Sequence, residues 1–291
     1  MHELPDLRTA LGAVPIRRDV VRVYGPQALE FLQGQLSQDV SALVVGESAV
    51  SLLLQPTGKV EAWLRVTRIA DDAMLLDVDG GWGLAVLARL KRFKLRTDAE
   101  LDLEEWAGLA IRGPGAGDID VPPGSHGLRA FWPGVDGIDV LSAGEIALAG
   151  VPLVEPAALE ALRIECGVPA MGAELTDATI PAEAGAWLID ASVSFTKGCY
   201  TGQELVARID SRGGNVPHPV RGLRIEAGPV PVGTEILVGD KQVGTVTSIA
   251  HSPRLGDIAL GLVSRSTTIG DVVELRWSDG VATATVAELP L

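Results

Sequence analysis

The residues with the clearest chemical potential stand together in one octapeptide, residues 197–204, which reads Lys-Gly-Cys-Tyr-Thr-Gly-Gln-Glu. It holds Cys199, one of only two cysteines in the chain. Thr201 and Glu204 have the spacing of a capping box, which predicts a helix N-terminus at this point. Cys199 would precede that N-terminus, whose partial positive charge favours a thiolate, and Lys197 would add a full positive charge.

Two interpretations of the octapeptide follow from these residues. In the first, Cys199 is a reactive thiol and Gln203 orients a ligand through its amide. Gly198 and Gly202 would then let the backbone approach that ligand closely. In the second, the stretch is only the start of a helix over residues 202–208 with a buried cysteine, because free cysteine often packs as a small hydrophobic residue.

Metal and phosphate sites find little support elsewhere in the sequence. Two cysteines do not supply the four ligands of a self-contained iron–sulfur cluster, although a cluster shared with a partner stays open. A glycine-rich run at residues 113–117 lacks the lysine and hydroxyl of a phosphate-binding loop. The histidines are scattered singly, without the spacing of a zinc site, at His2, His126, His218 and His251. We therefore predict no metal site within this chain.

The overall charge disfavours nucleic acid as a main partner. The formal net charge is −14, whereas broad binding to phosphate backbones needs a basic surface. Between residues 197 and 224, however, five basic residues stand against two acidic ones, which leaves +3 around the octapeptide. This local charge suits a small anionic ligand, and the alternative is a solvated charged face.

Composition predicts a cytoplasmic protein of more than one domain. No apolar run approaches the roughly 18 residues that suggest a membrane span, so we expect no membrane contact. Two cysteines are too few for a disulfide framework, which fits a reducing compartment. The length of 291 residues is enough for two or three domains with an ample core.

Hydrophobic periodicity predicts alternating strands and helices in the first part of the chain. The expected strands cover residues 20–24, 50–54, 60–69 and 74–78. The expected helices begin at Pro26 with Gly34 as the stop, at about residue 83, and at about Pro156 with Gly167 as the stop after Cys166. Residues 113–137, rich in glycine and proline, are predicted to be loop.

From residue 220 onward the pattern changes to short alternating segments separated by turns that contain glycine. These segments are residues 221–226, 235–238, 243–250, 258–263, 272–277 and 282–287. They predict a small antiparallel barrel. Pro217, His218 and Pro219 mark the expected boundary, so we divide the chain into residues 1–216 and residues 217–291 of an α+β protein.

The octapeptide resembles the K-G-C-[YF]-x-G-Q-E signature of the YgfZ-type folate-binding proteins, which are relatives of the glycine-cleavage T-protein. Weaker stretches resemble further motifs of this family in the same order along the chain. They are residues 31–40 (Phe-Leu-Gln-Gly-Gln-Leu-Ser-Gln-Asp-Val), 55–59 (Gln-Pro-Thr-Gly-Lys), 111–114 and 162–167. The resemblance covers most of the chain and implies a T-protein-like folate-binding fold with a C-terminal β-barrel, two subdomains preceding the barrel.

The resemblance also implies a ligand and a role in the cell. The ligand would be tetrahydrofolate or a derivative, and the partners would be iron–sulfur client or assembly proteins whose clusters this protein helps to build or repair. Arg163 matches an arginine that faces folate in T-proteins, and its guanidinium suits a ligand carboxylate. Its other role would be a salt bridge to Glu160 or Glu165.

A flat pterin ring would stack on an aromatic side chain, and our preferred candidate is Trp187, just upstream of the octapeptide. Core packing is the alternative role for each candidate. The other candidates are Trp63, Tyr24 and Tyr200.

Two departures from the T-protein argue against glycine-cleavage activity. Residues 76–84 contain Asp77 and Asp79, but neither matches the position of the catalytic aspartate of T-proteins, and Val135 replaces a glutamate that recognises the pterin. Valine accepts no hydrogen bond from the pterin N–H groups. The alternative function is a folate-dependent one-carbon transferase, for example in tRNA modification. A third is a scaffold that kept the fold without the chemistry.

Overall fold

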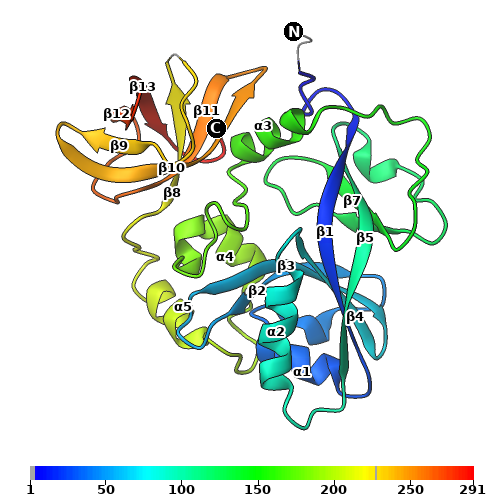
Figure 1. The fold of residues 1–291 in the computed structure, drawn as a ribbon. Coiled ribbons are helices and arrows are strands. Elements are labelled where there is room, and N and C mark those ends of the chain that lie inside the picture. Colours follow the sequence, from blue (N-terminus) through cyan, green and yellow to red (C-terminus); the bar gives the residue numbers. More distant parts are fainter. Residues whose placement is uncertain (1–3, 227) are drawn as a thin grey trace.

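The computed structural model describes residues 4–226 and 228–291, which form a seven-stranded sheet, a helical segment and a closed barrel (Figure 1). The sheet consists of β1 (Gly12–Tyr24), β2 (Ser48–Leu54), β3 (Val60–Ala70), β4 (Ala73–Asp79), β5 (Glu100–Arg112), β6 (His126–Arg129) and β7 (Gly137–Ser142). Its order is β2-β3-β4-β1-β5-β7-β6, and all neighbours are antiparallel. The helices are α1 (Ala28–Gln35), α2 (Gly83–Lys94), α3 (Pro156–Cys166), α4 (Ala186–Ser192) and α5 (Gln203–Asp210), with short 3-10 turns at η1 (Val40–Ala42), η2 (Ala116–Asp118) and η3 (Pro181–Ala184).

The long pair of β1 and β5 holds the sheet together. Every residue of β1 is paired with one of β5, from Gly12 opposite Arg112 to Tyr24 opposite Glu100. β4 pairs only with the second half of β1, and β7 pairs only with the second half of β5. Because β1 and β5 are antiparallel, the pair therefore joins two smaller groups of strands that lie at its opposite ends (Figure 1).

α1 and α2 lie beside the end of the sheet that contains β2, β3 and β4 (Figure 1). Phe31 and Leu32 of α1 and Val86 and Leu90 of α2 are buried in the main core, spaced so that one side of each helix is apolar. α4 packs against β2.

α3 connects the sheet to the barrel. It begins at Pro156 and ends at Cys166, as predicted. Gly167 adopts a left-handed conformation with φ +68°, and the N–H groups of Gly167 and Val168 donate to the last carbonyl oxygens of the helix. α3 packs on barrel strand β10 and also contacts β1, so it forms one wall of the space between the two parts.

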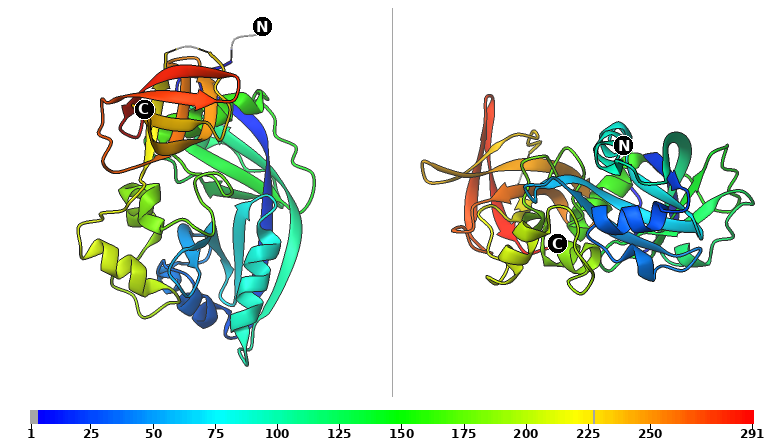
Figure 2. Two further views of the ribbon diagram at one scale, coloured as in Figure 1. Left: turned by 60° about the vertical axis from the view of Figure 1, so that its left-hand side comes forward. Right: turned by 90° about the horizontal axis from the view of Figure 1, so that it is seen from below.

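The C-terminal part is the predicted antiparallel barrel. Its strands are β8 (Val220–Ile225), β9 (Glu235–Val238), β10 (Lys241–Ser252), β11 (Gly256–Val263), β12 (Val272–Trp277) and β13 (Gly280–Ala287). They close in the order β10-β11-β8-β13-β12-β9 around fully buried residues such as Leu223, Ile236 and Leu275. The N–H of Leu291 donates to the Glu165 carbonyl at 2.7 Å, which fixes the end of the chain beside α3 (Figure 1). Figure 2 shows the barrel next to the sheet from two further directions.

Two predicted elements need correction, and one strand was missed. α1 ends at Gln35, so Gly34 lies inside the helix and does not stop it. Residues 113–137 are not all loop, because β6 starts at His126 and pairs with β7. β5 was missed because the alternation of leucine with acidic residues over 100–103 is interrupted by Glu104 and Glu105.

Within the described ranges, no helix has both the length and the apolar character that a membrane crossing requires.

Candidate ligand cavity and signature loop

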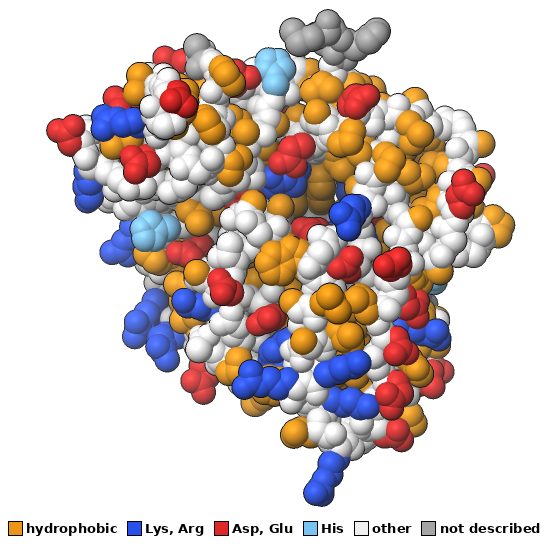
Figure 3. All heavy atoms as spheres, viewed as in Figure 1, with side chains coloured by type: hydrophobic (Ala, Val, Ile, Leu, Met, Phe, Trp, Pro, Cys, Tyr) orange, Lys and Arg blue, Asp and Glu red, His pale blue; other side chains and the backbone are white. Residues whose placement is uncertain are grey.

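A cavity of about 380 Å³ lies between the first half of β1, the ends of β5 and β7, and α3. Figure 3 shows the surface hollowed beside α3, with acidic and basic side chains around the opening. A smaller recess of about 50 Å³ shares four of its lining residues, Arg18, Trp63, Trp132 and Asp139. The larger cavity is also lined by Arg17, Asp79, Arg112, Glu160 and Arg163. It therefore combines indole rings with charges of both signs.

The strand register places two of these charges together. Asp139 on β7 is paired with Ala110 on β5, and Gly137 is paired with Arg112. A Cβ at position 137 would lie 2.6 Å from Cδ of Arg112, so the glycine makes room for the arginine side chain. Arg112 and Asp139 consequently lie next to each other at the edge of the cavity.

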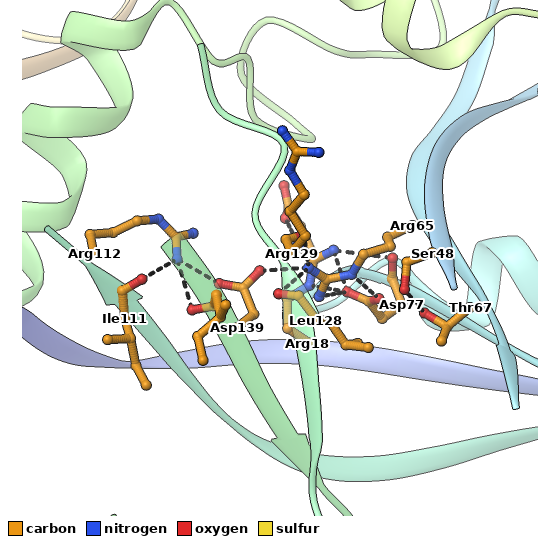
Figure 4. Close-up of polar contacts among 12 residues, drawn as sticks. Arg18, Ser48, Arg65, Thr67, Asp77, Ile111, Arg112, Leu128, Arg129 and Asp139 are labelled. Carbon is orange, nitrogen blue, oxygen red and sulfur yellow. Dashed lines mark hydrogen bonds and ion pairs between the residues drawn. The ribbon is translucent and has the colours of Figure 1, made fainter. Parts of the chain in front are cut away.

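Six charged side chains form a chain of ion pairs along this wall, and Figure 4 shows most of it. The order is Arg112, Asp139, Arg65, Asp77, Arg18 and Asp79, so positive and negative charges alternate. The side chain of Arg65 is 4% exposed and that of Asp77 is 1% exposed, so the central charges of the network are almost completely shielded from solvent. Buried charges are tolerated when they are paired and hydrogen-bonded in this way.

The electrostatics of the network keep Asp139 ionised. Burial alone would raise the pKa of this carboxyl, but the guanidinium groups of Arg112, Arg65 and Arg18 outweigh burial and lower the pKa to about 2. An aspartate with this pKa accepts hydrogen bonds at neutral pH and does not serve as a proton donor.

Arg112 is held tightly and still has unused donor capacity. Its Nη1 donates to the carbonyl oxygens of Ile111 and Ile138 at 3.0 and 3.1 Å. Its guanidinium carbon lies 4.4 Å from the ring centroid of Trp132, a cation–π contact. Its Nε is buried without a hydrogen-bond partner among the described residues. A buried donor of this kind is normally satisfied by something, which suits a polar group in the cavity.

Arg163 lines the cavity from α3, and all its N–H groups have acceptors. Nε and Nη2 form a two-pronged pair with the carboxylate of Glu160 at 2.8 and 2.7 Å. Nη1 donates to the Val168 carbonyl at 2.6 Å and to Glu174 at 3.2 Å. Nη2 also donates to Oγ of Ser248 in β10 at 2.6 Å. Arg163 therefore joins α3 to the barrel.

Trp63 lines the cavity and also packs against the main core. Its Nε1 donates to Oγ of Ser192 at 3.0 Å, which fixes the ring plane. Trp187 contacts it edge-on, with 6.0 Å between ring centroids and 85° between the planes. Trp187 is not among the residues that line the cavity, so it packs against Trp63 without facing the cavity itself.

The octapeptide forms a loop anchored by Lys197. The ammonium donates to three backbone carbonyl oxygens, those of Gln33, Leu36 and Gln38, at 2.7, 2.7 and 2.9 Å. An ammonium has three N–H donors, so all are used, and Lys197 has none left for the Cys199 thiolate. Burial lowers the pKa of Lys197 to about 8, against the opposing charge of Asp39. Any effect of Lys197 on the thiol therefore acts through its charge.

The predicted capping box is wrong. α5 begins at Gln203 with Gly202 as its N-cap, and neither Thr201 nor Glu204 makes a cap hydrogen bond. Gly202 has φ +84°, and a Cβ there would lie 2.5 Å from the carbonyl oxygen of Gln55. The side chain of Gln203 turns back, and its Oε1 accepts from the Tyr200 N–H at 3.1 Å. Contact with the turn that precedes β3, and not a side-chain cap, decides where this helix starts.

The two cysteines occupy opposite environments. Cys199 is exposed, whereas Cys166 is fully buried at the end of α3. Burial raises the pKa of the Cys166 thiol to about 11. The sulfur of Cys166 accepts a hydrogen bond from Nη2 of Arg8 at 3.4 Å. In residues 4–226 and 228–291, no group of three or more potential ligands is arranged to hold a metal ion, and His2 lies outside these ranges.

Comparison with known proteins assigns the family. The model of the GCVT N-terminal domain matches residues 17–119, and that of the glycine cleavage T-protein C-terminal barrel domain matches residues 219–291. An aminomethyltransferase of Rubrobacter xylanophilus is 31% identical over 94% of this chain and 81% of the relative. The chain belongs to the glycine cleavage T-protein family.

Within this family the chain is a YgfZ-type member. The tRNA-modifying protein YgfZ of Edwardsiella ictaluri is 28% identical over 93% of this chain and 89% of the relative. The fold agrees, because the crystal structure of aminomethyltransferase T from Bartonella henselae superimposes with a TM-score of 0.79. That match has 22% identity and covers 98% of this chain and 87% of the other. The resemblance first noted in the octapeptide is thus confirmed.

The structure separates the predicted site residues of this YgfZ-type protein into two groups. Arg163 and Trp63 line the cavity, whereas no residue of the octapeptide appears in its described lining. Tyr200 packs against the main core, and burial raises its pKa to about 12. Tyr24 donates to Asp102 at 2.9 Å at the surface. Glu165, one of two expected partners of Arg163, pairs instead with Arg8 and Arg254.

Sequence reasoning missed the ion network. A signal was available, because Arg65, Asp77 and Asp139 each interrupt an apolar strand, where an unpaired charge would be expensive. The pairing partners come from strands far apart in sequence, so the cluster emerges only from the topology.

Proposed function

We propose that this YgfZ-type protein binds a reduced folate in the cavity beside α3. The observation that carries the proposal is the lining itself, in which Trp63 and Trp132 accompany ionised carboxylates and guanidinium groups in about 380 Å³. Ligand sites of this kind have volumes of about 300–1,000 Å³. When bound, a reduced folate would supply a carrier for one-carbon units.

Each part of a folate has a suitable partner in this lining. The indole faces of Trp63 and Trp132 suit a flat pterin. Asp139 and Asp79 are carboxylates that would accept hydrogen bonds from pterin N–H groups. They would replace the glutamate of T-proteins, at whose position this chain has Val135. Arg163, at the α3 side, suits the carboxylate of the glutamate tail.

Calorimetric titration with tetrahydrofolate tests this proposal. We expect Trp132→Leu to weaken binding at least about tenfold, because it removes both a stacking face and the cation–π support of Arg112. Trp277→Leu is the matched control, since Trp277 lies on β12 of the barrel and away from the cavity. No heat of binding at millimolar tetrahydrofolate would remove folate from the proposed function.

We further propose that the signature loop, residues 197–204, supports the assembly or repair of iron–sulfur enzymes through Cys199. Its thiol is exposed, and the loop around it is fixed by Lys197 and Gly202. A thiolate is a ligand for iron and iron–sulfur clusters. One exposed cysteine supplies one ligand, so client or assembly proteins would have to supply the others.

Complementation of a strain that lacks this protein tests the thiol. We expect wild type, but not folded Cys199→Ala, to restore cluster-dependent enzyme activities under oxidative stress. Thr196→Ala, an exposed substitution on the same loop, is the control and should restore them fully. Full rescue by Cys199→Ala would show that the thiol is dispensable and would favour a scaffold.

The alternative function is a one-carbon transferase that uses the bound folate. Asp79 favours it, because this carboxylate lines the cavity with 38% of its side chain exposed, even though no carboxylate was expected at the T-protein catalytic position. The pairing of Asp79 with Arg18 argues the other way. Transfer of a labelled one-carbon unit from 5,10-methylenetetrahydrofolate to tRNA by purified protein, abolished in Asp79→Asn, would establish the transferase.

A further inference from the structure

One carboxylate in the cavity already occupies the position that a ligand carboxylate would take. Glu160 lines the cavity together with Arg163 and fills the outer edge of its guanidinium with two parallel hydrogen bonds of 2.7 and 2.8 Å. This two-pronged geometry is the one by which arginine recognises any carboxylate. As the structure stands, Arg163 has no free edge for a ligand.

The two edges of the Arg163 guanidinium differ in how firmly they are held. The inner edge contacts the Val168 carbonyl, Ser248, which is 5% exposed, and Glu174, which is fully buried. The outer edge contacts only Glu160, whose side chain is 42% exposed. The Arg163 side chain is only 10% exposed, so its guanidinium needs a carboxylate partner, whereas Glu160 regains water when it is released. The outer contact is therefore the one that a ligand carboxylate can replace.

We propose that Glu160 stands in for the ligand's carboxylate and is displaced when the ligand binds. The inference rests on the proposed folate site and names its specificity determinant. The inner contacts keep the Arg163 fork oriented, so one carboxylate replaces another without movement of the guanidinium, and Glu160 turns into water. The cavity would therefore select ligands that carry a carboxylate tail, at an affinity reduced by the internal competitor.

Two ligands separate this effect from pterin binding. Tetrahydrofolate carries the glutamate tail, and tetrahydropteroate lacks it. We expect Glu160→Gln to bind tetrahydrofolate about three- to fivefold more tightly than wild type, since it removes the internal carboxylate that competes for Arg163. Tetrahydropteroate should bind both proteins equally. Glu155→Gln is the matched control, because it removes the same charge from the start of the same helix at an exposed residue outside the cavity lining.

The experiment is calorimetry on the full chain, with circular dichroism to verify that each variant is folded. An unchanged affinity of Glu160→Gln for tetrahydrofolate would overturn the inference, and so would an equal gain for tetrahydropteroate. Loss of tail-dependent binding in Arg17→Gln alone would also overturn it, by moving the carboxylate to the exposed Arg17 at the cavity. If neither ligand binds wild type, the proposed folate site itself fails.

Discussion

Replacement of Gly202 by alanine should destabilise the protein, because this glycine is required by contact and by conformation. Its φ of +84° lies in the left-handed region, where a side chain costs about 1–2 kcal/mol. A Cβ would also lie 2.5 Å from the carbonyl oxygen of Gln55 and 2.8 Å from Cβ of Leu54. Neither atom belongs to the far end of a flexible side chain, so the backbone must shift, which costs about 1–3 kcal/mol more. We expect a total loss of about 2–5 kcal/mol.

Gly198→Ala is the matched control within the same octapeptide. A Cβ at position 198 meets no atom within 4 Å, and its φ is not in the left-handed region. Its effect should stay within about 0.5 kcal/mol. Urea denaturation followed by tryptophan fluorescence measures both variants. A loss below about 1 kcal/mol for Gly202→Ala, or equal losses for the two variants, would refute the packing role and return Gly202 to a role in ligand binding.

Three more predictions follow from the buried and exposed charges and thiols. Alkylation at pH 7 with peptide mapping should label exposed Cys199 and spare Cys166, whose pKa is raised to about 11 by burial; the reverse order would contradict the assignment. Lys197→Met should lose roughly 2 kcal/mol in urea denaturation, because three carbonyl oxygens lose a charged donor, and it should slow Cys199 labelling; unchanged stability would contradict the anchor role. The pKa of Asp139 is depressed to about 2, so its stabilising contribution, on the order of 2 kcal/mol, is present above pH 4 and lost as the pH falls towards 2. The acid slope of stability should flatten in Asp139→Asn, and an unchanged slope would exclude this residue as its source.

Local patterns predicted the elements whose signals are local. The segments after residue 220 alternate with period two between turns, and each has its counterpart among β8 to β13. α3 has proline at its start and glycine at its stop, and both of its bounds were predicted. β5 carries such a signal only over 100–103, where leucine alternates with acidic residues, and pairing with β1 on one side and β7 on the other stabilises the rest of the strand.

The candidate site shows the same difference between local signals and contacts with residues that are distant in the sequence. The octapeptide is contiguous, so its identity could be read directly, but the role of each residue depends on distant neighbours. Gly202 is explained by Gln55, and Lys197 is explained by carbonyl oxygens at the end of α1. The cavity was out of reach, because Arg65 and Asp139 meet only after the sheet has assembled around β1 and β5.

β3 and α4 connect the cavity to the signature loop. The turn before β3 packs on Gly202, and Trp63 lies about 10 Å along the strand from its first residue, Val60, at about 3.3 Å per residue. Ser192, at the end of α4, accepts from the Trp63 indole and offers its carbonyl oxygen to the hydroxyl of Ser37 at 2.6 Å.

Ser37 lies between Leu36 and Gln38, two of the three residues whose carbonyl oxygens hold Lys197. The backbone that fixes the indole on one side therefore fixes the signature loop on the other. A ligand that stacks on Trp63 and a partner that binds at Cys199 would both contact parts of the chain that are hydrogen-bonded to residues 36–38, the first through Ser192 and the second through Lys197. This shared support gives a physical reason why one fold keeps a folate-type cavity and an exposed signature thiol together, although no residue of the octapeptide appears in the cavity's described lining.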